Sequence, residues 1–90
     1  DPLLAPSVAA AGPRILAFHV CDWLRHTQEP LLDRGMMGDG VIDLRRLRAM
    51  VEATGFDGPV EVEIFSRDRW WREAPDVVLR TCRERLETVC

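Results

Sequence analysis

Apolar and polar positions alternate with a period of two early in the chain, and this pattern predicts a strand. Residues 15–23 (ILAFHVCDW) form a continuous, mostly apolar run after the turn-forming pair Gly12-Pro13. Such a run is typical of a strand buried on both faces in a parallel sheet. One face is bulky and apolar, and the other is small or polar: the first carries Leu16, Phe18 and Val20, and the second Ala17, His19 and Cys21.

A second strand is predicted at residues 60–66, directly after the pair Gly58-Pro59. Its side chains alternate in the same way, with Val60, Val62 and Ile64 on one face and Glu61, Glu63 and Phe65 on the other. The apolar face is again matched by a polar one.

Apolar residues at helical spacing follow each predicted strand. The first helix is expected to begin after Asp43, a suitable N-cap, and to end before Gly55, which can adopt the left-handed conformation found after many helices. A last helix is expected from Pro75 toward Cys90. The apolar positions are Leu44, Leu47, Met50 and Val51 in the first helix and Val78, Cys82, Leu86 and Val89 in the second. The predicted order is strand, helix, strand, helix.

Two parallel strands joined by crossover helices need further strands beside them before the sheet is buried on both sides. Apolar residues facing the helices, with His or Glu on the opposite face, are typical of a closed barrel whose active site lies at the carboxyl ends of the strands. An open doubly wound sheet would need apolar residues on both faces. We therefore predict the α/β class, with residues 1–90 forming two βα units of a (β/α)8 TIM barrel.

The size and the start of the chain agree with this view. A lone domain of 90 residues would bury only about 60–65% of the surface of its unfolded form and would be marginally stable. The chain opens at Asp1 without a methionine, so we expect the true N-terminus to be missing.

Composition and charge narrow the possible classes of partner. All 12 basic residues are arginine and the net charge is −3, which does not favour nucleic-acid binding. The Ala-rich residues 6–12 follow no basic segment and are too short to span a bilayer. Three cysteines without CxxC spacing predict reduced thiols and a cytoplasmic protein rather than disulfides or a cysteine zinc site.

His19 and Glu63 are the candidate metal ligands. On neighbouring barrel strands, about 4.8 Å apart, an imidazole and a carboxylate can share one divalent ion. Two ligands do not complete a site, so the others must come from strands outside this chain. A lone strand histidine is more often structural, whereas an inward carboxylate such as Glu63 needs a cation or a donor to offset its desolvation. For Glu61, a structural salt bridge is favoured over a catalytic role.

The irregular residues 22–42 are rich in turn formers, and connections of this length tend to be functional. Arg34 is the candidate substrate-binding residue, able to clamp an oxygen or a phosphate, and the following glycines could let the backbone approach that ligand. The alternative is a solvated turn. Asp22 could orient the His19 ring or cap the loop. Trp70 and Trp71 could stack on a sugar or simply pack, and residues 67–72 are a candidate homo-oligomer contact.

Together these residues resemble the sugar phosphate isomerase/epimerase family, also described as xylose isomerase-like barrels. The resemblance runs from Ile15 to the C-terminus and depends on the order of several motifs. These are His19-Val20-Cys21-Asp22, Asp33-Arg34 with Gly38-Asp39-Gly40-Val41-Ile42-Asp43, and Gly55-Phe56-Asp57-Gly58 leading into Glu61-Val62-Glu63-Ile64-Phe65.

The resemblance implies that the two strands are the seventh and eighth of the barrel, so that residues 1–90 are its C-terminal part. It also implies that His19 is the histidine metal ligand and Glu63 the last carboxylate ligand. In the epimerases similar to this chain, the carboxylate that matches Glu63 also moves a proton beside a carbonyl, through an enediolate. The related endonuclease IV enzymes have a histidine shortly after the Asp-Arg pair, where this chain has Gly35, which weighs against DNA repair.

The expected function is that of a metal-dependent sugar or polyol isomerase or epimerase, with this segment inactive alone. The alternatives are a polyol dehydratase on the same barrel and a non-catalytic binding module. One nitrogen and one oxygen ligand suit Mn, Mg, Co or Zn about equally, so the residues leave the metal open.

Overall fold

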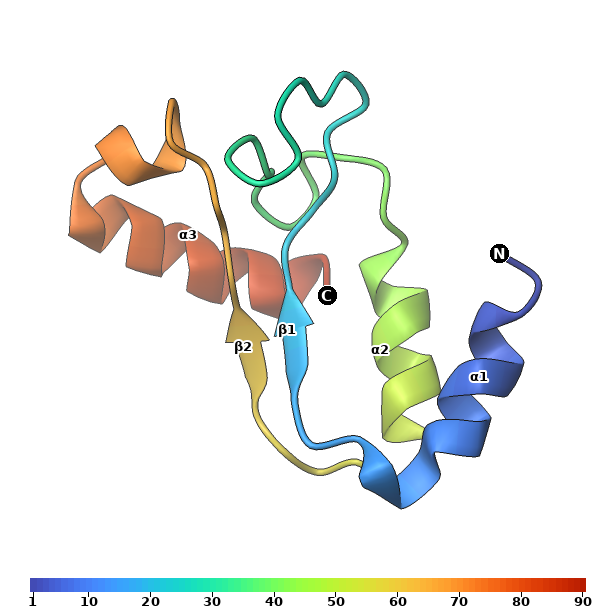
Figure 1. The fold of residues 1–90 in the computed structure, drawn as a ribbon. Helices are drawn as coiled ribbons and strands as arrows, with labels where there is room; N and C mark the ends of the chain where they lie inside the picture. Colours follow the sequence, from blue (N-terminus) through green and yellow to red (C-terminus); the bar gives the residue numbers. More distant parts are fainter.

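The computed structural model describes residues 1–90 and confirms the predicted order of strands and helices (Figure 1). Its elements are α1 (Leu4–Ala11), the 3-10 turn η1 (Gly12–Arg14), β1 (Phe18–Val20), α2 (Leu44–Glu52), β2 (Val60–Val62), the 3-10 turn η2 (Trp70–Arg72) and α3 (Pro75–Thr88). The two strands are parallel, and the segments that leave them depart from the same end of the pair (Figure 1). Candidate site residues after both strands are therefore brought to one end of the molecule.

Both strands are shorter than the apolar runs predicted. In the paired register, Phe18 lies opposite Val60, His19 opposite Glu61 and Val20 opposite Val62. Beyond this ladder the chain pairs with the long loop instead, through single bridges from Asp22 to Gly35 and from Asp33 to Ser66. Leu16 was expected on the apolar face but is 88% exposed, because β1 begins only at Phe18.

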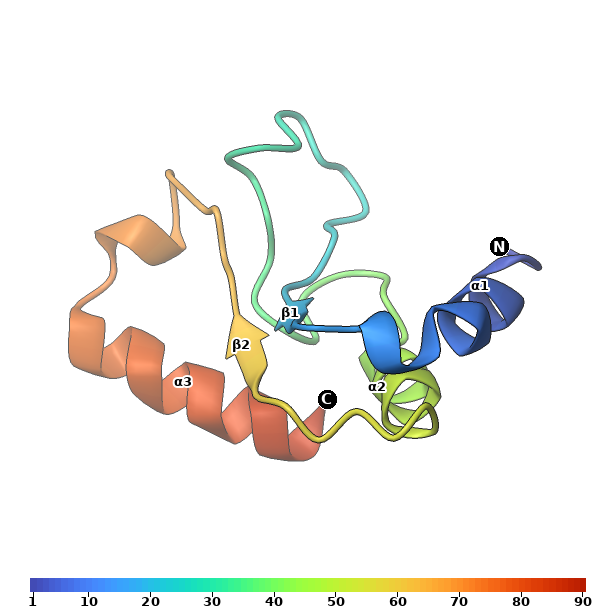
Figure 2. The same cartoon turned by 60° about the horizontal axis from the view of Figure 1, so that its bottom comes forward.

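The core lies under the apolar face of the strands, where α3 covers it (Figure 2). Its buried members are Val20, Met36, Met37 and Leu44. The partly buried residues packed against them include Val78, Cys82 and Leu86 of α3. The predicted apolar side of α3 is therefore confirmed. The two methionines are a finding that the pattern missed, because they lie among turn formers. Their unbranched, flexible side chains suit an irregular gap between the strands and α3.

The predicted helix signals are confirmed for α2. The Asp43 carboxylate accepts a hydrogen bond from the Arg46 N–H at 3.1 Å, as an N-cap does. Gly55 follows the helix with φ of 89°, a conformation that glycine adopts at little cost.

Helix α1 was not predicted, although its composition favours it. The segment is rich in alanine, the best helix former. Pro6 lies in the first turn, where its missing N–H breaks no helical hydrogen bond. The helix lies beside α2 in both views (Figures 1 and 2). No helix has both the length and the apolar content needed to cross a membrane.

The chain is more open than an independent domain of its size. It exposes 6319 Å², whereas a compact protein of 10.3 kDa exposes about 5,400 Å². Its radius of gyration is 13.8 Å, against about 12 Å for a compact domain of this length. The exposed apolar side chains include Leu16, Leu31, Leu79, Trp71 and Phe65. This surface fits two βα units whose neighbours in a barrel lie outside the chain.

Candidate functional site

The polar face of the strand pair gathers His19 and two glutamates. His19 Nε2 lies 3.0 Å from Glu61 Oε2, and His19 Nδ1 lies 3.7 Å from Glu63 Oε1. The three side chains are 44–56% exposed, since nothing in this chain covers that face. The imidazole therefore sits between two carboxylates on an open surface.

Parallel pairing explains how residues so far apart in sequence meet. Glu61 is the register partner of His19, so the pleat places both side chains on the same face. Glu63 follows β2 directly, and its N–H donates to the Val20 carbonyl at 2.9 Å. One register thus fixes both carboxylates relative to the imidazole.

Arg34 reaches the same site from the long loop. Its backbone N–H donates to the Phe65 carbonyl at 2.8 Å, which anchors the loop beside the segment after β2. The guanidinium lies over the rings of Phe65 and Trp23, 5.1 and 5.8 Å from their centroids, where a cation is attracted to the ring faces. Arg34 Nη1 lies 3.7 Å from Glu63 Oε2. The predicted substrate-binding residue is therefore placed beside the predicted catalytic carboxylate.

Asp22 does not orient His19; it caps the loop, the second of the two predicted roles. The side chain is 1% exposed, and its two oxygens accept four backbone N–H bonds at 2.8–3.0 Å. The donors are Trp23, Gly38, Gly40 and Ile42. A carboxylate occupied in this way has no oxygen left for the imidazole.

The loop glycines serve the same contact rather than an open ligand position. The amides of Gly38 and Gly40 point at Asp22 Oδ2. A Cβ at position 40 would overlap the Trp23 carbonyl oxygen, and Gly38 has φ of 87°. The expected backbone approach to a ligand is therefore wrong at these two positions.

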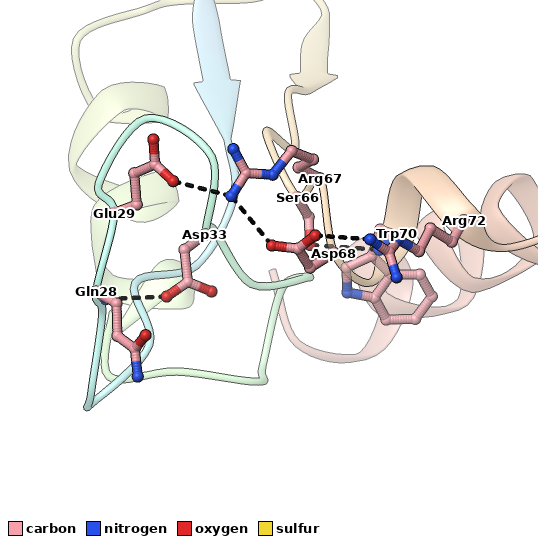
Figure 3. A network of polar contacts seen from close by, with 8 residues as sticks. All are labelled: Gln28, Glu29, Asp33, Ser66, Arg67, Asp68, Trp70 and Arg72. Carbon is pink, nitrogen blue, oxygen red and sulfur yellow. Dashed lines mark hydrogen bonds and ion pairs between the residues drawn. The ribbon is translucent and has the colours of Figure 1, made fainter.

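A network of exposed charges joins the long loop to the segment after β2 (Figure 3). Arg67 contacts both Glu29 at 3.0 Å and Asp68 at 3.2 Å, and Arg72 contacts Asp68 at 2.9 Å. The hydrogen bond from Arg67 lowers the pKa of the Asp68 carboxyl, and the same contact raises the pKa of Arg67. The network lies beside the Asp33–Ser66 bridge and supports the loop that carries Arg34.

The two tryptophans have different environments and do not form one flat platform. Trp70 packs against the core cluster. Trp71 is 54% exposed, donates from Nε1 to the Ile64 carbonyl at 2.9 Å, and meets Phe65 edge to face. Trp70 is therefore a packing residue, whereas Trp71 keeps an exposed ring at the end of the strands.

The site residues fit a metal ion as part of a ligand set. Ligands bound to one ion at about 2.1 Å are separated by roughly 3–3.5 Å, and His19 Nδ1 and Glu63 Oε1 approach this spacing at 3.7 Å. Both belong to the residue types that divalent ions select. No group of three His, Cys, Asp or Glu side chains in the chain is arranged to hold an ion. The chain thus places two side chains of ligand type next to each other.

Parallel strands with polar side chains at one end are typical of α/β proteins, and comparison with known families identifies the kind of α/β protein. The chain belongs to the xylose isomerase-like TIM barrel family, whose model matches residues 1–82. This assignment confirms the fold class predicted from the alternation of the strands.

A solved structure gives the same result at the level of coordinates. The crystal structure of protein SMc04130 from Sinorhizobium meliloti 1021 is similar to the whole of this chain, with a TM-score of 0.95 and 55% sequence identity. The chain spans 34% of that protein, as expected for part of a barrel. Among curated proteins, no match was found.

Proposed function

We propose that the barrel carrying this chain is a metal-dependent isomerase or epimerase of a sugar or polyol. The observation that carries the proposal is the approach of His19 Nδ1 and Glu63 Oε1 on the open face, with Arg34 beside the same carboxylate. Family membership supports the class, since the xylose isomerase-like family includes sugar isomerases and epimerases.

In this proposal His19 and Glu63 hold one divalent ion together with ligands from other strands of the barrel. A divalent ion bound there supplies a Lewis acid that polarises the substrate carbonyl. Glu63 removes a proton from the carbon beside that carbonyl. In an isomerisation it then delivers the proton to the former carbonyl carbon, whereas in an epimerisation a second group must deliver a proton to the opposite face of the first carbon. Arg34 binds a substrate oxygen, because its guanidinium is held over two rings with its Nη1 atom toward Glu63.

The test uses the complete barrel protein and measures its metal content together with deuterium uptake into substrate. Wild type should retain a near-stoichiometric divalent ion, and His19→Ala and Glu63→Ala should each lose most of it. In D2O, a panel of ketoses and inososes should include one compound that takes up deuterium only with the metal-loaded wild type.

Two residues of the same types provide matched controls. His26→Ala removes the other histidine of the chain, which lies exposed in the loop. Glu52→Ala removes a glutamate of similar exposure that pairs with Arg48 on α2. Both variants should keep the metal and the exchange activity.

Three other results would contradict the proposal or change the assigned reaction. A folded wild type without metal, unchanged by the site substitutions, would contradict it and favour a binding protein on the same barrel. Metal-dependent loss of water from a polyol would identify a dehydratase instead. Loss of metal from the control variants would show that the effect is not specific to the site.

A further inference from the structure

We propose that Glu61 is a positioning residue, which holds the His19 imidazole so that Nδ1 is presented toward Glu63 as a metal ligand. The inference rests on the proposed function, because it assigns a role to a further residue at the same site. It does not make Glu61 a ligand or a catalytic group.

The contact distances distinguish the two nitrogens of the imidazole. Nε2 lies 3.0 Å from Glu61 Oε2, within hydrogen-bonding distance. Nδ1 lies 3.7 Å from Glu63 Oε1, beyond it. One nitrogen is thus placed for a direct contact with a carboxylate, and the other faces a carboxylate across a gap.

The chemistry of a neutral imidazole turns this difference into a preference. A neutral imidazole carries one proton, and the nitrogen without it has the lone pair that binds a metal. A carboxylate next to Nε2 favours the proton there, because two acceptors in contact repel each other. The lone pair then lies on Nδ1, which faces Glu63.

Glu61 is suited to this role because its only ion pair is with His19. Glu63 is shared between His19 and Arg34, and Asp22 is occupied by four backbone amides. The register also fixes Glu61, since it lies directly opposite His19 in the β1–β2 ladder. Carboxylates that accept from the second nitrogen of a histidine ligand commonly fix the orientation of its ring.

The experiment compares metal affinity in the complete barrel protein with and without this carboxylate. Affinity for Mn, Co or Zn ions is measured by competition with a chelator for wild type, Glu61→Ala, Glu61→Gln and Glu52→Ala. Glu52 is the matched control because its side chain is 52% exposed, against 56% for Glu61, and it also forms an ion pair. Far-UV circular dichroism checks that each variant is folded.

Glu61→Ala should weaken metal binding by about 10- to 100-fold, the usual effect of removing a residue that orients a ligand. Glu61→Gln should weaken it less, because the amide oxygen can still accept from Nε2–H. Glu52→Ala should match wild type. Affinity for Glu61→Ala equal to wild type would overturn the proposal, as would an equal loss in Glu52→Ala.

A second measurement is independent of metal and of activity. In the metal-free protein with labelled histidine, the Nε2–H proton of His19 should give a downfield signal that His19→Ala abolishes. Glu61→Ala should abolish that signal too, whereas Glu52→Ala should keep it. A signal that survives in Glu61→Ala would contradict the proposed hydrogen bond.

The two proposals fail in different ways. If His19→Ala and Glu63→Ala lose metal but Glu61→Ala does not, the proposed function stands and the role of Glu61 falls. If wild type holds no metal, the proposed function falls and with it the metal-ligand role of His19. The imidazole signal would then decide only whether Glu61 contacts the ring.

Discussion

The two faces of the β1–β2 pair differ in what surrounds them, although the same two strands form both. The apolar face is covered by α3 and by the loop methionines, and Val20 at its centre is 2% exposed. The polar face carries His19, Glu61 and Glu63, which are about half exposed. The covered face gives this chain its hydrophobic core, and the open face holds the side chains of the proposed metal site. Substitutions on the first should change the free energy of unfolding, and those on the second should change metal binding.

The largest effect on stability is expected at Met36, on the covered side. Met36→Ala removes a side chain with 0% exposure, and truncations of this kind cost about 2–5 kcal/mol. The shift is measured by denaturant unfolding of the complete protein, with Leu31→Ala, at a residue 71% exposed, as the control. Metal affinity of the folded protein should be unchanged. An affinity loss as large as that of Glu63→Ala would contradict the expectation that the covered face affects stability and not metal binding.

The next largest effect on stability is expected at Asp22, a buried residue shortly after the end of β1. Asp22→Asn keeps the shape but replaces one oxygen by an NH2 group among four backbone donors. Loss of hydrogen bonds to a charged acceptor costs about 1.5–3 kcal/mol. Faster hydrogen exchange at the amides of Gly38 and Gly40 should accompany the loss. Asp57→Asn, at an exposed loop position, should show neither change.

On the open face, Glu63→Gln should reduce metal binding strongly and change the free energy of unfolding little. Its contacts to His19 and Arg34 are both 3.7 Å long and partly exposed, and such pairs contribute at most about 1 kcal/mol. The unfolding free energy of the metal-free variant should therefore stay within that range of wild type. Metal retention should fall sharply. A variant that kept its metal but unfolded much more easily would make Glu63 a structural residue.

The smallest effect is expected in the exposed network around Asp68. Its folded pKa lies below the usual value of 3.8, so its contribution to stability is present above pH 3.8 and is lost as the pH falls through the lower folded value. Asp68→Asn should slightly lower the melting temperature at neutral pH, and the difference should vanish well below pH 3.8. High salt should also reduce it, because exposed ion pairs are screened. A difference that persisted at low pH would exclude the charge as its cause.

Local rules were sufficient for much of the fold. The period of two placed Val20 and Val62 on one face and His19 on the other, and the cap at Asp43 and the turn at Gly55 were confirmed. The structure corrected the expectations for Leu16 and for the loop glycines. Leu16 is exposed because the strand pairing begins after it, and the glycine amides are taken up by Asp22, which is distant in sequence. A pattern confined to neighbouring residues could predict neither the limit of the pairing nor the contact.

The amino-acid sequence by itself determined the βα order, the barrel class and the polar face with His19 and Glu63, because these follow from side-chain periodicity and local turn chemistry. Only the tertiary structure decided which carboxylate meets which group. The parallel register places Glu61 opposite His19, and the folded loop brings its amides to Asp22. Both contacts depend on backbone positions in three dimensions. The sequence alone does not show which of the carboxylates Asp22, Glu61 and Glu63 meets the imidazole, because that depends on the strand register and on the path of the loop.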